Sequence, residues 1–106
     1  MELREYLDVD GRSPFAEWLA GLDPQPRAKV AAHLVRMKNG NVSNVKGVRS
    51  GVLEKKIDWG PGYRVYFGKD GDDLIILLAG GSKASQDKDI ESAHDRWADY
   101  KRRKKG

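Results

Sequence analysis

The residues best suited to chemistry lie on two predicted strands that flank Gly60-Pro61-Gly62. Apolar and polar residues alternate on both sides of this segment, which predicts a β-hairpin. With a three-residue loop, Trp59 lies opposite Tyr63 and Ile57 lies opposite Val65. Successive side chains of a strand point to opposite faces, so one face of the hairpin collects polar residues. These are Glu54, Lys56, Asp58, Arg64 and Tyr66.

Arg64 is predicted to lie on a central strand. The apolar run 74–78, which follows a turn at Asp70-Gly71, predicts a third strand beside the hairpin. A guanidinium with apolar neighbours is costly unless it has a partner. It either pairs with Glu54 or Asp58 across the hairpin or is available to an anion.

The elements that must position this hairpin lie on both sides of it. Ser13-Pro14 and Asp23-Pro24 each combine an N-cap residue with proline at the first helical position. Apolar residues at helical spacing follow both, so a helical hairpin is predicted in the first half. Residues 2–9 fit an edge strand, and the stretch 41–51 is predicted to be a loop. Ser85 is predicted to begin a closing helix.

The length of 106 residues suits one domain, which we place at residues 1–100. The basic tail, 101–106, has no apolar anchor and is predicted to be disordered. The sequence lacks cysteine, which excludes disulfides and thiolate metal sites and fits a reducing compartment. No apolar run approaches the length of a membrane-spanning helix. A cytoplasmic location without membrane contact is therefore expected.

Positive charge is concentrated in the centre of the chain and in the tail. The net charge is +4, and residues 24–69 hold ten Lys or Arg against two acidic residues. Clustered cations suit a polyanion, because each phosphate contact releases condensed counterions; a solvated surface is the alternative. The predicted nucleic-acid contacts are Lys46, Arg49 and Lys55, together with Tyr66 as a platform for a base.

Two motifs resemble a known family. The segments 60–67 (GPGYRVYF) and 77–90 (LLAGGSKASQDKDI) resemble the signature of addiction-module killer proteins. These form a branch of the RelE/ParE superfamily, close to the HigB-type toxins of type II toxin-antitoxin systems. Phe15 to Leu19 resembles the family's Phe-x-x-Trp-Leu, and Gly40-Asn41 with Lys46 resembles its Gly-Asn-x-x-x-x-Lys linker. The resemblance covers nearly the whole chain except the basic tail.

The resemblance implies an α+β protein with a RelE-like microbial ribonuclease fold. In that fold an N-terminal helical hairpin packs on an antiparallel sheet of three to four strands, with a C-terminal helix. Arg64 stands where these ribonucleases keep the arginine that stabilises charge at the scissile phosphate. Lys83 stands where the family keeps a basic residue after the last strand. Lys56 replaces the arginine of the usual Glu-Leu-Arg, and Ile90 replaces a tyrosine of some relatives, so the general base is not identified.

The implied reaction is attack of the ribose 2′-hydroxyl on the adjacent phosphate. It needs a proton acceptor, a proton donor for the leaving 5′-oxygen and cations that stabilise the phosphorane. No metal ion or cofactor is required, and none is predicted. His33 and His94 fall within predicted helices, so lysines are expected to transfer protons. Arg64, Lys83 and Lys56 are the predicted catalytic residues.

The predicted function is an endoribonuclease toxin, an mRNA interferase that inhibits translation. Its partners would be an antitoxin encoded by an adjacent gene and messenger RNA, either free or on the ribosome. The resemblance leaves two alternatives open. One is a ParE-like poison of DNA gyrase without nuclease activity, and the other is a noncatalytic RNA-binding module.

Overall fold

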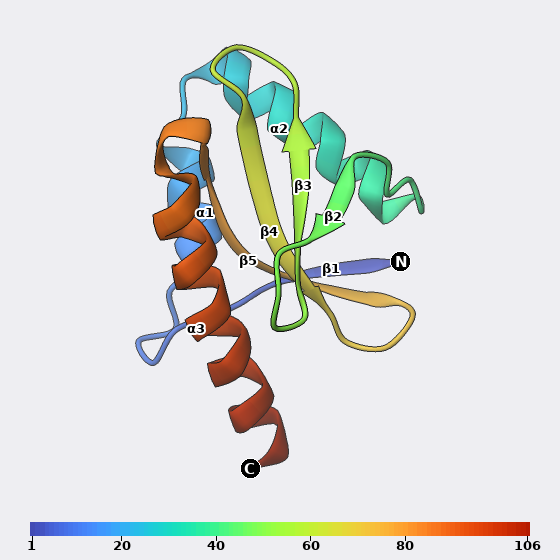
Figure 1. The fold of residues 1–106 in the computed structure, drawn as a ribbon, viewed down its shortest axis with the longest axis vertical. Coiled ribbons are helices and arrows are strands. Elements are labelled where there is room, and N and C mark those ends of the chain that lie inside the picture. Colours follow the sequence, from blue (N-terminus) through green and yellow to red (C-terminus); the bar gives the residue numbers. More distant parts are fainter.

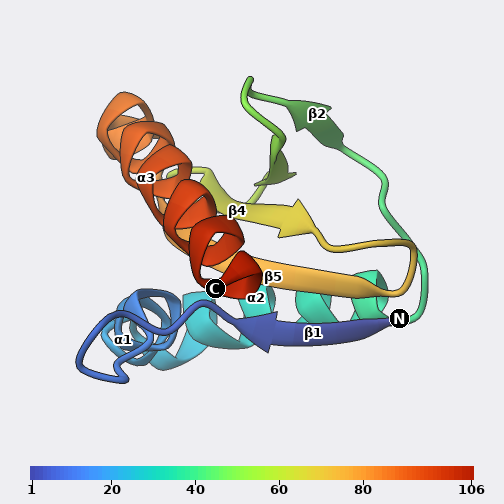
Figure 2. The same ribbon diagram turned by 90° about the horizontal axis from the view of Figure 1, so that it is seen from below.

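The computed structural model describes residues 1–106 as a mixed sheet with helices on both faces (Figures 1 and 2). The chain begins with strand β1 (Glu2–Glu5) and helices α1 (Pro14–Ala20) and α2 (Pro24–Lys38). Four strands follow: β2 (Val45–Gly47), β3 (Val52–Ile57), β4 (Tyr63–Lys69) and β5 (Leu74–Ser82). A 3-10 turn, η1 (Lys83–Ser85), leads into helix α3 (Gln86–Lys105).

The predicted fold class is wrong. The sheet has five strands in the order β1-β5-β4-β3-β2, and β1 pairs with β5 in parallel, so it is not an antiparallel sheet of three to four strands. The N-terminal part is a strand followed by short helices rather than a helical hairpin on a sheet. Helix α1 packs on β5 more than on α2, with Trp18 covering Gly80. The parallel pairing joins segments far apart in sequence, which local patterns do not reveal.

The predicted helix starts are confirmed. Helix α1 begins after Ser13, whose Oγ accepts a hydrogen bond of 3.0 Å from the backbone N–H of Ala16. Helix α2 begins after Asp23, with Pro24 at its first position. Proline is tolerated there because the first N–H groups of a helix have no intrahelical partner.

The register of the β3–β4 hairpin differs from the prediction by two residues. Ile57 rather than Trp59 pairs with Tyr63, so the connection is five residues long. A shift of two residues preserves which side chains share a face. Lys56 and Arg64 therefore lie on the same polar face, as predicted, but Lys56 pairs with Arg64 rather than with Tyr66.

Helices cover both faces of the sheet, with α3 on one face and α1 and α2 on the other (Figure 2). Each face carries its own core of eight buried residues. Beneath α3 lie Tyr6, Val52, Tyr66, Ile76, Leu78 and Ala79 with Ala93 and Trp97 of the helix. The opposite core contains Phe15, Val30 and Met37 of the helices with Ile57, Val65, Phe67, Ile75 and Leu77. Strands β4 and β5 are thus buried on both sides, as the apolar run predicted.

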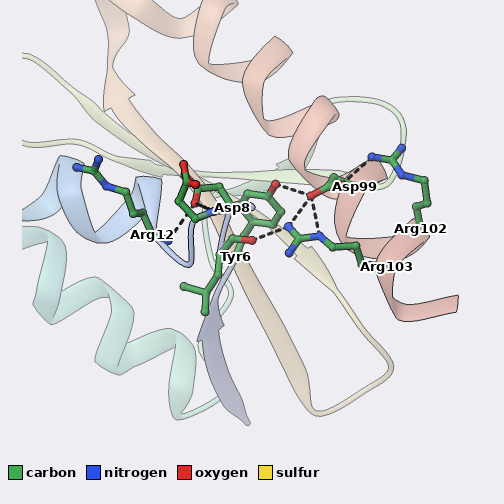
Figure 3. A network of polar contacts seen from close by, with 8 residues as sticks. Tyr6, Asp8, Arg12, Asp99, Arg102 and Arg103 are labelled. Carbon is green, nitrogen blue, oxygen red and sulfur yellow. Dashed lines mark hydrogen bonds and ion pairs between the residues drawn. The ribbon is translucent and has the colours of Figure 1, made fainter. Parts of the chain in front are cut away.

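Helix α3 extends into the basic tail that was predicted to be disordered. Helix α3 continues to Lys105, and side chains near its end are anchored. Asp99 accepts hydrogen bonds from the Tyr6 hydroxyl and from Arg102 and Arg103 (Figure 3). Lys104 forms an ion pair with Asp70. No helix of the structure is both long enough and apolar enough to span a membrane.

Candidate anion-binding site

Arg64, Lys56 and Lys83 line one open hollow of about 260 Å³ at the edge of the sheet. Its wall is the connection between β3 and β4, including Asp58, Trp59 and Gly60 to Gly62. The backbone N–H of Lys83 donates a 2.9 Å hydrogen bond to the Gly62 carbonyl, which ties η1 to this connection. The β3–β4 hairpin and η1, which follows β5, therefore bring the three predicted catalytic residues together.

Arg64 forms the floor of the hollow. It is only 6% exposed, and its register places it between Lys56 of β3 and Gly81 of β5. Its Nε lies 3.7 Å from Glu54 Oε1, which is an ion pair but too long for a hydrogen bond. Both Nε and Nη1 are buried without a hydrogen-bond partner. A charged donor left in this state is costly, so the guanidinium is prepared for an anionic acceptor.

Glu54 is the buried counter-ion of Arg64 and is 1% exposed. Its carboxylate also accepts a 3.0 Å hydrogen bond from Gln86 Nε2 and lies 3.7 Å from Lys46 Nζ. Tyr66 lies directly opposite it on β4. Burial, followed by the negative charge of Glu54, raises the pKa of Tyr66 far above its usual range, so the phenol stays neutral.

The start of α3 lies beside Arg64 because Gly81 has no side chain. A Cβ at Gly81 would fall 1.8 Å from Asp89 Oδ2 and 2.8 Å from Ser85 Oγ. The Ser85 hydroxyl donates a 2.5 Å hydrogen bond to that carboxylate. The N-terminus of a helix carries a partial positive charge, and the carboxylates of Asp87 and Asp89 in the first turn of α3 offset it.

The rim of the hollow is exposed and of mixed charge. Lys56 Nζ lies 3.5 Å from Asp58 Oδ1, and the two side chains are 50% and 70% exposed. Water screens such a pair, so it holds neither side chain firmly. Lys83 is exposed and forms no ion pair within 4.0 Å. The exposed side chains of Lys56 and Lys83 thus flank the buried guanidinium of Arg64.

The other predicted contact residues do not line the hollow, although Lys46 lies beside it through its ion pair with Glu54. Lys46 and Arg49 are exposed, on β2 and on the turn that follows it. Lys55 points to the opposite face of the sheet, is 3% exposed and donates a 2.5 Å hydrogen bond to the Ser43 carbonyl. Burial, and then the charge of Arg36, lowers the pKa of Lys55. It is therefore not part of the hollow.

Tyr66 is fully buried, so it offers no face on which a base could stack. Neither histidine lines the hollow. His33 is on α2, and His94 Nε2 on α3 lies 2.7 Å from the Val48 carbonyl, as expected for a structural side chain. No group of three or more His, Asp or Glu side chains is arranged to hold a metal ion.

Three residues of this region were missing from the predicted site: Glu54, Asp58 and Gln86. The strand alternation placed Glu54 and Asp58 on the face of Arg64, which was the available signal. Gln86 comes from α3 and reaches Glu54 across 32 positions of sequence, so no local pattern could indicate it.

The arrangement defines a small α+β protein with a cationic hollow where the inner strands β3 and β4 are connected. A search of protein-family models finds no match. The chain is 44% identical over 80 residues to an uncharacterized protein of Haemophilus influenzae, an alignment that covers 74% of this chain and 81% of that protein. The chain belongs to the same family as this protein.

Proposed function

We propose that this protein is the toxin of a type II toxin-antitoxin system and that it cleaves messenger RNA at the hollow around Arg64. The observation that carries the proposal is a buried arginine with unpartnered Nε and Nη1 atoms, flanked by Lys56 and Lys83. Phosphate oxygens satisfy such donors, and a guanidinium whose Nε and Nη1 make no hydrogen bond in the free protein suits a charge that grows during reaction. The motif resemblance to RelE/ParE toxins supports RNA as the source of the phosphate.

In the proposed reaction the ribose 2′-oxygen forms a bond to phosphorus while the bond from phosphorus to the 5′-oxygen breaks. A side chain accepts the 2′-hydroxyl proton, and another donates a proton to the leaving oxygen. Asp58 is the carboxylate on the rim and serves as the acceptor, whereas Lys83 serves as the donor. Arg64 stabilises the negative charge of the phosphorane, and Lys56 helps to hold the phosphate. The products are a 2′,3′-cyclic phosphate and a free 5′-hydroxyl.

The test uses the purified protein with RNA, with and without ribosomes, and identifies the chemical ends of the products. Removal of one charge-stabilising group costs about 10²–10³ in rate, so Arg64→Gln should lower cleavage by that factor. Arg27→Gln, at an exposed position of α2, is the matched control. Cleavage by Arg64→Gln at the rate of the control, or cleavage that depends on an added metal ion, would refute the assignment.

A second candidate is a ParE-like poison of DNA gyrase. It is favoured by one observation, that neither His33 nor His94 lines the hollow, so the usual imidazole acid or base is missing. Inhibition of gyrase supercoiling without any RNA product identifies this function. RNA binding with neither activity identifies a noncatalytic module.

A toxin of this kind acts in the cytoplasm and needs an antitoxin. An acidic, amphipathic segment of an antitoxin from the adjacent gene would find charge complementarity at the exposed Lys46, Arg49 and Lys56. Coexpression should restore growth and yield a stable complex. Reversal of these three charges should slow association, most strongly at low salt. A chain that is harmless when expressed alone contradicts the toxin assignment.

A further inference from the structure

A second cationic surface lies at the opposite end of α3 from the Arg64 hollow. It surrounds a hollow of about 370 Å³, and we call it the Lys101 surface. Its lining consists of Lys69, Asp70, Trp97, Tyr100, Lys101, Lys104 and Lys105. Figure 1 shows the C-terminal turns of α3 extending beyond the rest of the helix's contact with the sheet.

Three lysines of this surface form no ion pair. Lys104 pairs with Asp70, whereas Lys69, Lys101 and Lys105 have no carboxylate within 4.0 Å. Lys101 Nζ instead lies 5.6 Å from the centroid of the Trp97 ring. The surface therefore holds an excess of positive charge around one hollow.

Stabilisation of the helix does not account for this excess. Cations near a helix C-terminus interact favourably with the helix dipole, which explains basic residues in the last turn of α3. Lys69, however, comes from the end of β4 and not from the helix. Its ammonium adds like charge beside Lys101 and Lys105, which is unfavourable without an anion.

The hollow also has an aromatic component. The Trp97 and Tyr100 rings are stacked at 5.3 Å with an interplanar angle of 6°, and Tyr100 is partly exposed. Surfaces that bind single-stranded nucleic acid combine cations for the backbone with aromatic rings beside them. Trp97 is only 6% exposed and belongs to the core under α3, so Tyr100 alone offers a partly exposed ring, and the identity of the ligand rests on the cations and on the proposed function.

We propose that the Lys101 surface is a second contact for the RNA backbone, used by an RNA that also occupies the Arg64 hollow. This inference rests on the proposed function for the identity of the ligand. From Gln86 to Lys101 the helix rises by about 22 Å, so only a longer RNA reaches both places. Between them, Arg49 shares a hollow with Asp87 and Glu91, whose mixed charge gives an RNA little attraction.

The experiment measures binding of uncleavable 2′-O-methyl RNA as a function of salt. A dinucleotide is compared with an RNA of about sixteen nucleotides, using the full chain and the triple variant Lys69→Ala, Lys101→Ala, Lys105→Ala. Each lost phosphate contact lowers the slope of log K against log salt by about 0.7 for single strands, so the triple variant should lose about 2 from its slope for the longer RNA. Its affinity for the dinucleotide should not change.

The matched control removes three exposed cations from α2, with Arg27→Ala, Arg36→Ala and Lys38→Ala, and should retain the full slope. The inference is overturned if the Lys101-surface variant keeps the full salt slope for the longer RNA, or if the control variant loses as much slope. Either result leaves the proposal of RNA cleavage at Arg64 standing. Loss of antitoxin affinity with an unchanged RNA slope assigns the surface to a protein partner and also overturns it. Absence of RNA binding by the unaltered chain overturns both proposals.

Discussion

Replacement of Glu54 by glutamine tests whether the charge of Arg64 is balanced inside the protein. Glutamine keeps the shape of the side chain and its ability to accept from Gln86, but it removes the negative charge. Arg64 would then be a buried cation whose Nε and Nη1 lack a hydrogen-bond partner and whose nearest counter-ion is gone. The variant should fold with lower stability.

The size of the effect follows from the geometry. At the observed 3.7 Å, Coulomb's law with an effective dielectric constant of 20 gives about 4 kcal/mol. Loss of one partner of a buried pair costs about 3–5 kcal/mol. A loss of about 3 kcal/mol corresponds to a fall in Tm of roughly 12 °C for a domain of this size.

Thermal unfolding followed by circular dichroism measures the change. The control is Glu17→Gln, which breaks an exposed pair with Arg12 and should cost less than about 1 kcal/mol. Sulfate should restore part of the lost stability of Glu54→Gln, because it supplies the anion that Arg64 then lacks. The double change with Arg64→Met should also recover stability. A Tm within two degrees or so of the control, with no response to sulfate, would refute this account of the buried pair.

Two further predictions concern helix α3. Gly81→Ala should lower the free energy of unfolding by about 1–3 kcal/mol in denaturant titrations, because the new Cβ would displace Asp89. The control Gly47→Ala adds a Cβ in open space and should change the free energy of unfolding by less than about 0.5 kcal/mol. Equal effects of the two substitutions would contradict this packing. Hydrogen bonds from Tyr6 and then Arg103 lower the pKa of Asp99 below its usual 3.8. This stabilisation is complete above about pH 5 and is lost as the pH falls through the lowered pKa, so the protection factors of the amides in the last turns of α3, corrected for the intrinsic exchange rate, should fall in acid, and Asp99→Asn should remove that dependence.

The parts of the fold that local chemistry determines could be predicted from the sequence. Ser13 and Asp23 marked the helix starts because capping and proline geometry act over a few residues. Strand alternation placed Glu54 and Arg64 on one face, which is the essential step toward the site. That inference survived an error in register because the error was two residues long.

The parts that depend on distant partners could not be predicted. Strand β2 has three residues, too few for a periodic pattern, and it lies in a segment predicted to be a loop. The edge strand predicted within residues 2–9 is present as β1, but its sequence does not indicate the parallel pairing with β5. Helix α3 continues through the basic tail, where Arg102 and Arg103 pair with Asp99 one turn earlier on the same helix and Lys104 pairs with the distant Asp70. Tyr66 was predicted to contact RNA but is buried, because α3 packs on its face of the sheet, and the packing position of α3 is not evident from the strand pattern.

The pairing of β1 with β5 also determines when the protein can fold during its synthesis. The first strand leaves the ribosome early, but its hydrogen-bonding partner is separated from it by two helices and three strands. Closing a contact of such long sequence separation is slow and comes late in folding. The Arg64 hollow also requires β5 to be in place, because Lys83 of η1 lines the hollow and η1 follows β5 directly. A nascent chain therefore cannot assemble this hollow until translation has passed Lys83, and any activity there is delayed until the sheet has closed.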